Sequence, residues 1–75
     1  MRSLSKIAAE IKTDWTNIST YAKPYLNAMH MLDSINDKYM LDPADEIVRR
    51  FLANARSWQG NKAREIKAEL KKMLK

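Results

Sequence analysis

DPADEIVRRFLANA, residues 42–55, decides the fold prediction for this 75-residue chain. Asp42 is a good helix N-cap, and Pro43 suits the first helical position because a backbone N–H there has no partner inside the helix. Asp45 adds an acid to the first turn, where the helix dipole favours it. Two acid-before-base pairs stand four residues apart: Asp45 with Arg49, and Glu46 with Arg50. The residues expected on the buried side recur at helical spacing: Ala44, Ile47, Val48, Phe51, Leu52 and Ala55.

Two further helices are predicted before this segment. The first has Ser3 as its N-cap and is expected to close within residues 14–17. Its apolar side is Leu4, Ile7, Ala8, Ile11 and Trp15. The second begins with Pro24 in its first turn. Its apolar side is Tyr25, Ala28, Met29, Leu32 and Ile35, and its polar side is Asn27, His30, Asp33, Ser34 and Asp37. Leu26 and Met31 fall at the margins of the apolar side and are expected to be partly exposed.

A last helix is predicted in the C-terminal third of the chain. Its inner side is Ala63, Ile66, Leu70, Met73 and Leu74. Gly60, the only glycine, leaves the start of this helix open. It either ends the third helix, with Asn61 capping the next one, or lies inside a final helix that Ser57 caps.

The fold class follows from these patterns. No segment alternates between apolar and polar residues as a half-buried strand does. A hydrophobic content of 45% beside 31% charged residues is typical of a globular protein, and 75 residues leave little room for a large ligand cavity. The sequence therefore predicts an all-α fold, a compact bundle of about four helices that forms a single helical domain over residues 1–75. Most of the aromatic residues are expected in the core.

The cellular compartment is suggested by what the sequence does not contain. Without cysteine the chain has neither disulfides nor a cysteine-based zinc site, which suits a reducing compartment. Lys6 and Glu10 interrupt the N-terminal apolar residues, so we expect neither a signal peptide nor a membrane span. A cytoplasmic location without membrane association is the expectation.

Few residues have the spacing that catalysis or metal binding needs. His30, Asp33 and Ser34 fall near one another on a predicted helix, but one solvated helix face lacks the buried acid and shielded oxyanion hole of a hydrolytic triad. A calcium loop starting at Asp33 would need an oxygen ligand at Ile35 and a glycine at Lys38. One glycine cannot form a phosphate-binding loop. We therefore predict no enzymatic activity, and neither catalytic, cofactor-binding nor metal-binding residues.

Charge is the most informative feature for function. Residues 54–75 carry seven Lys/Arg against two Glu, which accounts for the whole formal charge of +5. A localised basic surface indicates an acidic partner. The candidate binding residues are Arg56, Lys62, Arg64, Lys67, Lys71, Lys72 and Lys75.

A helical projection gathers part of this charge into one sector. Arg64, Lys67, Lys71 and Lys75 fall together beside the apolar stripe, with the two glutamates on the far side. The helix dipole favours cations in the last turn, but it does not explain those further back. A helix-turn-helix outline is present, yet the sector offers neither Asn nor Gln for reading adenine, so nucleic-acid contacts would be mostly to phosphates.

The chain also resembles a group of short helical proteins encoded by bacteriophages and prophage regions. The matching residues run through most of the chain: Leu4-Ser5-Lys6-Ile7-Ala8, Asp14-Trp15, Tyr21-Ala22, Pro24-Tyr25-Leu26, Ala28-Met29, Leu32, Phe51-Leu52, Asn54-Ala55, Trp58, Gly60, Ala63 and Ile66-Lys67. The resemblance implies an accessory protein that binds a host, defence or replication factor, as anti-CRISPR-type inhibitors do. It implies no particular catalytic or binding residue.

Three functions are consistent with these observations. The first is a non-catalytic phage-type accessory protein that binds and modulates a host or defence protein, or a nucleoprotein complex, through the basic C-terminal helix. The second is largely sequence-nonspecific binding of DNA or RNA by the same residues. The third is a structural protein that assembles with copies of itself.

Overall fold

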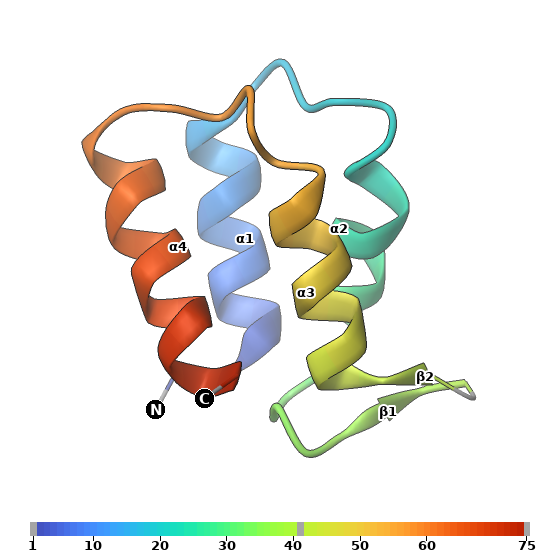
Figure 1. The fold of residues 1–75 in the computed structure, drawn as a ribbon. Helices are drawn as coiled ribbons and strands as arrows, with labels where there is room; N and C mark the ends of the chain where they lie inside the picture. Colours follow the sequence, from blue (N-terminus) through green and yellow to red (C-terminus); the bar gives the residue numbers. More distant parts are fainter. Residues whose placement is uncertain (1, 41, 75) are drawn as a thin grey trace.

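Four helices and a small hairpin form the structure, a computed structural model that describes residues 2–40 and 42–74. The elements in chain order are α1 (Leu4–Asp14), α2 (Lys23–His30), β1 (Lys38–Tyr39), β2 (Asp42–Pro43), α3 (Ala44–Ala53) and α4 (Asn61–Leu74). Each helix packs against two others in the cyclic order α1, α2, α3, α4, and Figure 1 shows α3 and α4 side by side and antiparallel. The prediction of a four-helix bundle is confirmed for the described residues.

The hairpin corrects the all-α prediction. β1 pairs with β2 in antiparallel register, Tyr39 opposite Asp42 and Lys38 opposite Pro43. Met40, between the strands, has a φ of 58°, a backbone conformation that residues other than glycine rarely adopt. These four strand residues contain too few apolar side chains to display the alternation by which a strand is recognised in a sequence.

The start of α3 also differs from the prediction. Pro43, in extended conformation, takes the N-cap position, and no side chain caps the helix. Asp42 is one residue too early to act as the cap, because its backbone pairs with Tyr39 across the hairpin. The acids in the first turn, Asp45 and Glu46, are where the sequence places them.

The second helix is shorter than predicted. It ends at His30, so Leu32 and Ile35 lie in a loop and reach the core from there. Side chains of this loop bond to its own backbone: the Asp37 carboxylate accepts hydrogen bonds from the backbone N–H groups of Asp33 and Ser34, both at 3.0 Å. Such local bonds compete with helix formation.

The same loop accepts hydrogen bonds from the first backbone N–H groups of α1. The N–H groups of Leu4 and Ser5 donate to the carbonyls of Asp33 and Leu32, at 3.0 and 2.8 Å. Ser3 caps the helix as predicted, since its hydroxyl accepts a hydrogen bond from the Lys6 N–H. The first turn of α1 and the segment after α2 are therefore joined through their backbones.

Gly60 fits neither of the two predicted arrangements. The third helix ends at Ala53, and the last begins at Asn61, so Gly60 lies between them. Its φ of 116° is a conformation that glycine adopts without strain, and its carbonyl accepts the first hydrogen bond of α4, from the Arg64 N–H at 3.0 Å. Gly60 is thus the residue that turns the chain into α4.

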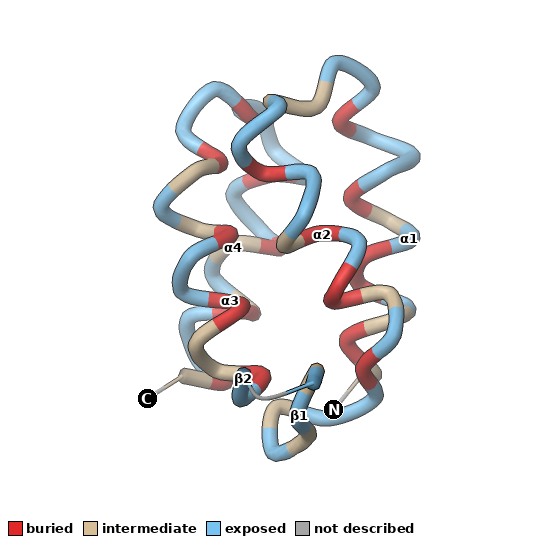
Figure 2. Tube along the Cα trace, turned by 90° about the vertical axis from the view of Figure 1, so that its right-hand side faces the viewer, coloured by how far each residue is buried: buried red, intermediate tan, exposed pale blue. Residues whose placement is uncertain are grey.

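Buried residues recur along all four helices, as the colouring of the chain trace in Figure 2 shows. The inner residues predicted for α1 are all buried, and those predicted for α3 and α4 are buried except for the partly exposed Leu52 and Leu74. Leu26, expected at the margin of α2, is fully buried instead, whereas Met31 is 74% exposed. Because α2 packs against both α1 and α3, its buried side is wider than the sequence pattern suggests.

Three aromatic rings join the ends of α1 and α3 to the loop before α4. The Trp15 and Trp58 rings stack at 5.7 Å between centroids, and Phe51 meets both edge to face, at 6.3 and 6.4 Å. The Trp58 indole N–H donates to the Asp14 carboxylate at 2.9 Å. This aromatic cluster (Trp15, Phe51 and Trp58) confirms the expectation that the large rings pack in the core.

We predict that Trp58→Phe lowers the free energy of unfolding by about 1–3 kcal/mol, because it removes buried ring surface and leaves Asp14 without its indole donor. Urea unfolding followed by circular dichroism measures the change. The control is Tyr21→Phe, at a residue 75% exposed, which should leave stability within about 0.5 kcal/mol of the original. Equal stabilities of the two variants would contradict the role given to Trp58.

Candidate functional site

The side of α4 that faces α1 is electrically neutralised. Arg2, just before α1, is paired with Glu10 and donates to Glu69 of α4 at 2.6 and 3.1 Å. Lys62 of α4 pairs with the same Glu10 at 3.0 Å. The hydrogen bond from Arg2 is the main reason why the pKa of Glu69 lies below its usual value. Lys62, Glu10, Arg2 and Glu69 thus form a continuous chain of ion pairs between α1 and α4, in which two positive charges balance two negative ones.

The side of α4 that faces α3 carries cations that are not paired with carboxylates of the described residues. Arg64, Lys67 and Lys71 lie about 140–180° around the helix from Lys62 and Glu69 by the 3.6-residue repeat. Arg64 and Lys67 line a shallow hollow together with Trp58, which follows α3. Neither Arg64 nor Lys71 forms an ion pair with any carboxylate of residues 2–40 and 42–74. Lys67 has no such ion pair either, so three cations without a carboxylate partner among these residues lie together on the α3 side of α4. Other cations among the described residues that lack an ion pair are spread over different elements: Lys6, Lys12, Lys23, Lys38, Arg56 and Lys72.

Of these three cations, Lys67 also stabilises the fold, through a contact with Trp58. Its ammonium group donates to the Trp58 carbonyl at 2.6 Å and lies 5.8 Å from the centre of the Trp58 ring. Partial burial lowers the pKa of Lys67, and the neighbouring Lys71 lowers it further. Lys67 therefore fastens α4 to the aromatic cluster while leaving part of its side chain exposed.

Arg49 adds a cation from the α3 side. The opposite side of α3 faces α2, where Ile47 and Arg50 border a hollow shared with Tyr25. Asp45 instead lies beside Leu74 of α4, and Arg49 pairs with Asp45 at 3.6 Å. We call Arg49, Arg64, Lys67 and Lys71 the basic face.

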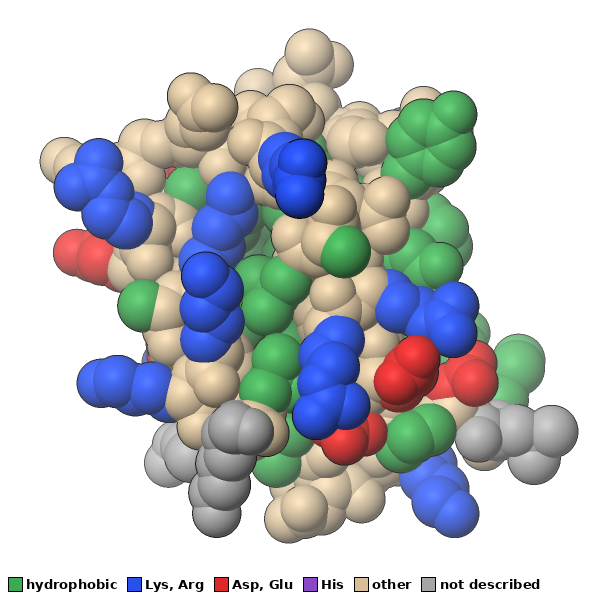
Figure 3. Space-filling view, viewed as in Figure 1, with side chains coloured by type: hydrophobic (Ala, Val, Ile, Leu, Met, Phe, Trp, Pro, Cys, Tyr) green, Lys and Arg blue, Asp and Glu red, His purple; other side chains and the backbone are tan. Residues whose placement is uncertain are grey.

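Hydrophobic side chains run between the two helices of the basic face. Figure 3 shows this band over the junction of α3 and α4, with Lys and Arg side chains along the α4 side and both basic and acidic side chains along the α3 side. Leu52 and Leu74, partly buried and packed against the core, are the large apolar residues that α3 and α4 leave accessible. The band and the flanking cations make a surface that offers both apolar contact and positive charge.

The structure separates the predicted binding residues into groups. Arg64, Lys67 and Lys71 lie on the basic face, while Lys62 belongs to the neutral network with Glu10. Arg56 is exposed in the loop before α4, and Lys72 is exposed on the outer side of α4. Lys75 lies outside the described residues. Sequence reasoning missed Arg49, Leu52 and Leu74, because their place beside the α4 cations depends on how α3 packs against α4.

The structure separates His30 from the two residues predicted to lie near it on one helix. Because α2 ends at this residue, Asp33 and Ser34 do not share a helical face with it. Its Nε2 atom is buried and has no hydrogen-bond partner among the described residues. Burial lowers the pKa of His30, and the positive charge of Lys12 lowers it further.

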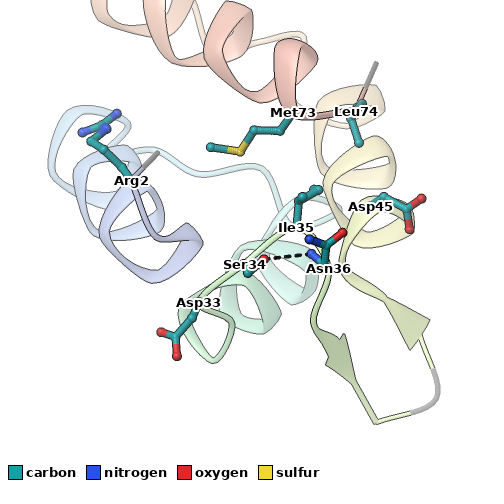
Figure 4. A pocket seen from close by; sticks show the side chains of 8 residues that line it. All are labelled: Arg2, Asp33, Ser34, Ile35, Asn36, Asp45, Met73 and Leu74. Atoms are coloured by element: carbon teal, nitrogen blue, oxygen red, sulfur yellow. Dashed lines mark hydrogen bonds between the residues drawn. The ribbon is translucent and has the colours of Figure 1, made fainter.

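A hollow of about 560 Å³ lies where the loop after α2 meets the C-terminal end of α4. Figure 4 shows that its charged side chains, Arg2, Asp33 and Asp45, stand on different sides of the opening and point in different directions. A ligand site needs polar groups that converge on one point, and these do not.

Residues 2–40 and 42–74 also lack a cluster of metal ligands and a helix that could cross a membrane. They contain no group of three or more His, Asp or Glu placed to hold a metal ion. Every helix among them is too short or too polar to traverse a lipid bilayer.

Comparison with known proteins gave no match: neither a family model, nor a curated protein, nor a solved structure is similar enough to the chain to count as a relative. The basic face therefore has to be interpreted from its own geometry.

The lowered pKa of His30 predicts a pH dependence of stability. The unfolded chain binds the proton first as the pH falls through about 6.5, so the free energy of unfolding should decrease between pH 7 and pH 5. Urea unfolding at the two pH values measures this. The variant His30→Gln should have a smaller decrease, and an unchanged decrease would show that other groups cause it.

Proposed function

We propose that this protein is a non-catalytic binding module that attaches to an acidic surface of a partner protein through the basic face. The observation that carries the proposal is the uneven neutralisation of α4. Cations on the side toward α1 are paired with Glu10 and Glu69, whereas Arg64 and Lys71, toward α3, have no such partner among the described residues. Lys67 is bonded to Trp58, and Lys71 lies in the last turn, where the helix dipole favours a cation, but neither reason applies to Arg64. The position of Arg64 therefore favours a role in binding.

A protein partner suits this surface better than a nucleic acid. Proteins that bind single strands present exposed aromatic rings on which bases stack. Here the rings packed beside α4 are buried, since Trp15, Phe51 and Trp58 are at most 6% exposed. Tyr21 is 75% exposed but precedes α2 and is not part of the basic face, from which Asn and Gln are also absent. The hydrophobic band between the cations matches the mixed apolar and polar character of protein interfaces.

The proposed partner class is a host or defence factor, in the cytoplasm of an infected bacterium. The resemblance to phage and prophage proteins supports this class, by analogy. A formal charge of +5 opposes the close approach of two copies, which makes a different, acidic partner the better candidate than a second copy of the chain.

Affinity capture from a bacterial lysate, with and without nuclease treatment, tests the proposal. The double variant Arg64→Glu/Lys71→Glu should lose the captured protein, because two attractive contacts become repulsive. The matched control, Lys6→Glu/Lys12→Glu, reverses two exposed charges on α1 and should retain it. Lys67 is left unchanged because its bond to Trp58 is structural. Circular dichroism checks that both variants fold.

Two outcomes would overturn the proposal. If the double variant captures the same protein as the unmodified chain, the basic face is not the binding surface. If capture depends on nucleic acid and disappears with nuclease, the runner-up function, binding of DNA or RNA, takes its place.

A further inference from the structure

The hydrophobic band has the shape of a seam between two antiparallel helices. Leu52 and Leu74 are its accessible apolar residues, above the fully buried Val48 and Leu70. α4 has 14 residues, which corresponds to a length of about 21 Å. A third helix of similar length can lie along such a seam, as helices do in bundles.

The backbone of α3 and α4 argues against an extended occupant. Nearly all N–H and C=O groups within helices are bonded to one another, so the seam offers no edge with which an extended peptide could form main-chain hydrogen bonds. A helical occupant satisfies its own backbone groups. It would contribute only side chains to the contact, and side chains are what the basic face presents.

The cations repeat along the seam with a helical period. Arg64, Lys67 and Lys71 are separated by three and four residues, which corresponds to steps of about 4.5 and 6 Å along the axis. An adjacent helix with acids at the same spacing presents its carboxylates at the same intervals. Arg49 lies across the band on α3 and is paired with Asp45 at 3.6 Å. Because both side chains are exposed, an acid on the other flank of that helix can compete with Asp45 for Arg49.

We infer that the seam between α3 and α4 receives an acidic amphipathic helix of the partner protein. The apolar stripe of that helix contacts Leu52 and Leu74, and carboxylates on its two flanks pair with the basic face. Charge complementarity identifies this occupant, since the seam is apolar along its middle and its α4 side carries Arg64 and Lys71, which have no carboxylate partner among the described residues. Its α3 side carries the exposed Arg49–Asp45 pair. The inference rests on the proposed function and specifies the partner structure that the basic face recognises.

Two synthetic peptides test the inference by fluorescence anisotropy with the full chain. The first has 14 residues, the length of α4, with leucines at helical spacing and glutamates on both flanks. The second has the same composition in an order that breaks the apolar stripe. We expect the first to bind about tenfold more tightly and to gain helical circular dichroism on binding, because only it can place leucines on the band and glutamates beside it.

Variants of the protein locate the contact. Leu74→Ser should weaken binding of the amphipathic peptide about threefold or more and leave the reordered peptide unaffected. Met31→Ser, which changes an exposed apolar residue outside the basic face, is the matched control and should have no effect. Leu52→Ser is a second variant, on the α3 side, and should weaken binding of the amphipathic peptide in the same way. Circular dichroism checks that it folds. Arg64→Glu/Lys71→Glu should weaken both peptides.

The results separate this inference from the proposed function. Equal binding of the two peptides, or an amphipathic peptide that stays unfolded when bound, would overturn the helical occupant while leaving an acidic partner in place. If neither peptide binds at low salt, both proposals fail, because a basic face that accepts acidic protein segments should retain one of them under these conditions.

Discussion

The stacking of Trp15 on Trp58, with Phe51 against both rings, is the contact on which the rest of the structure depends. A 75-residue chain without cysteine has a small core and no covalent bridges, so a few large side chains must hold its ends together. The cluster joins the end of α1, the last turn of α3 and the loop that leads into α4. Trp58 also accepts the hydrogen bond from Lys67, so the same residue determines which side of α4 faces α3.

That orientation divides the charge of α4 into two parts. Toward α1, Lys62 and Glu69 meet Glu10 and Arg2, and the four groups cancel. Toward α3, Arg64 and Lys71 stand beside an apolar band without carboxylate partners among the described residues. A bundle built only for stability would distribute these charges among opposite ones. On the basic face, neighbouring positive charges repel one another, which disfavours the folded state but favours binding of an acidic partner.

Much of the fold could be predicted from the sequence, because helical spacing and local capping act over a few residues. The Ser3 cap, the pairs of α3 and the inner side of α4 were all predicted. The early end of α2 was missed, since it depends on Asp37 bonding to backbone N–H groups and on α1 using the carbonyls of Leu32 and Asp33. For the candidate site, the sequence indicates the cationic sector of α4. It cannot reveal that Glu10 neutralises Lys62 or that Arg49 lies across the band, because both facts depend on helix packing.

The central claim is that the α3–α4 side of the molecule, and not its charge in general, recognises the partner. A titration of isotope-labelled protein with the amphipathic acidic peptide, followed by two-dimensional NMR, tests this most directly. The account predicts that the largest chemical-shift changes fall on Arg49, Leu52, Arg64, Lys71 and Leu74. Changes that are spread over all exposed lysines, or that centre on Lys6 and Lys12 of α1, would contradict it.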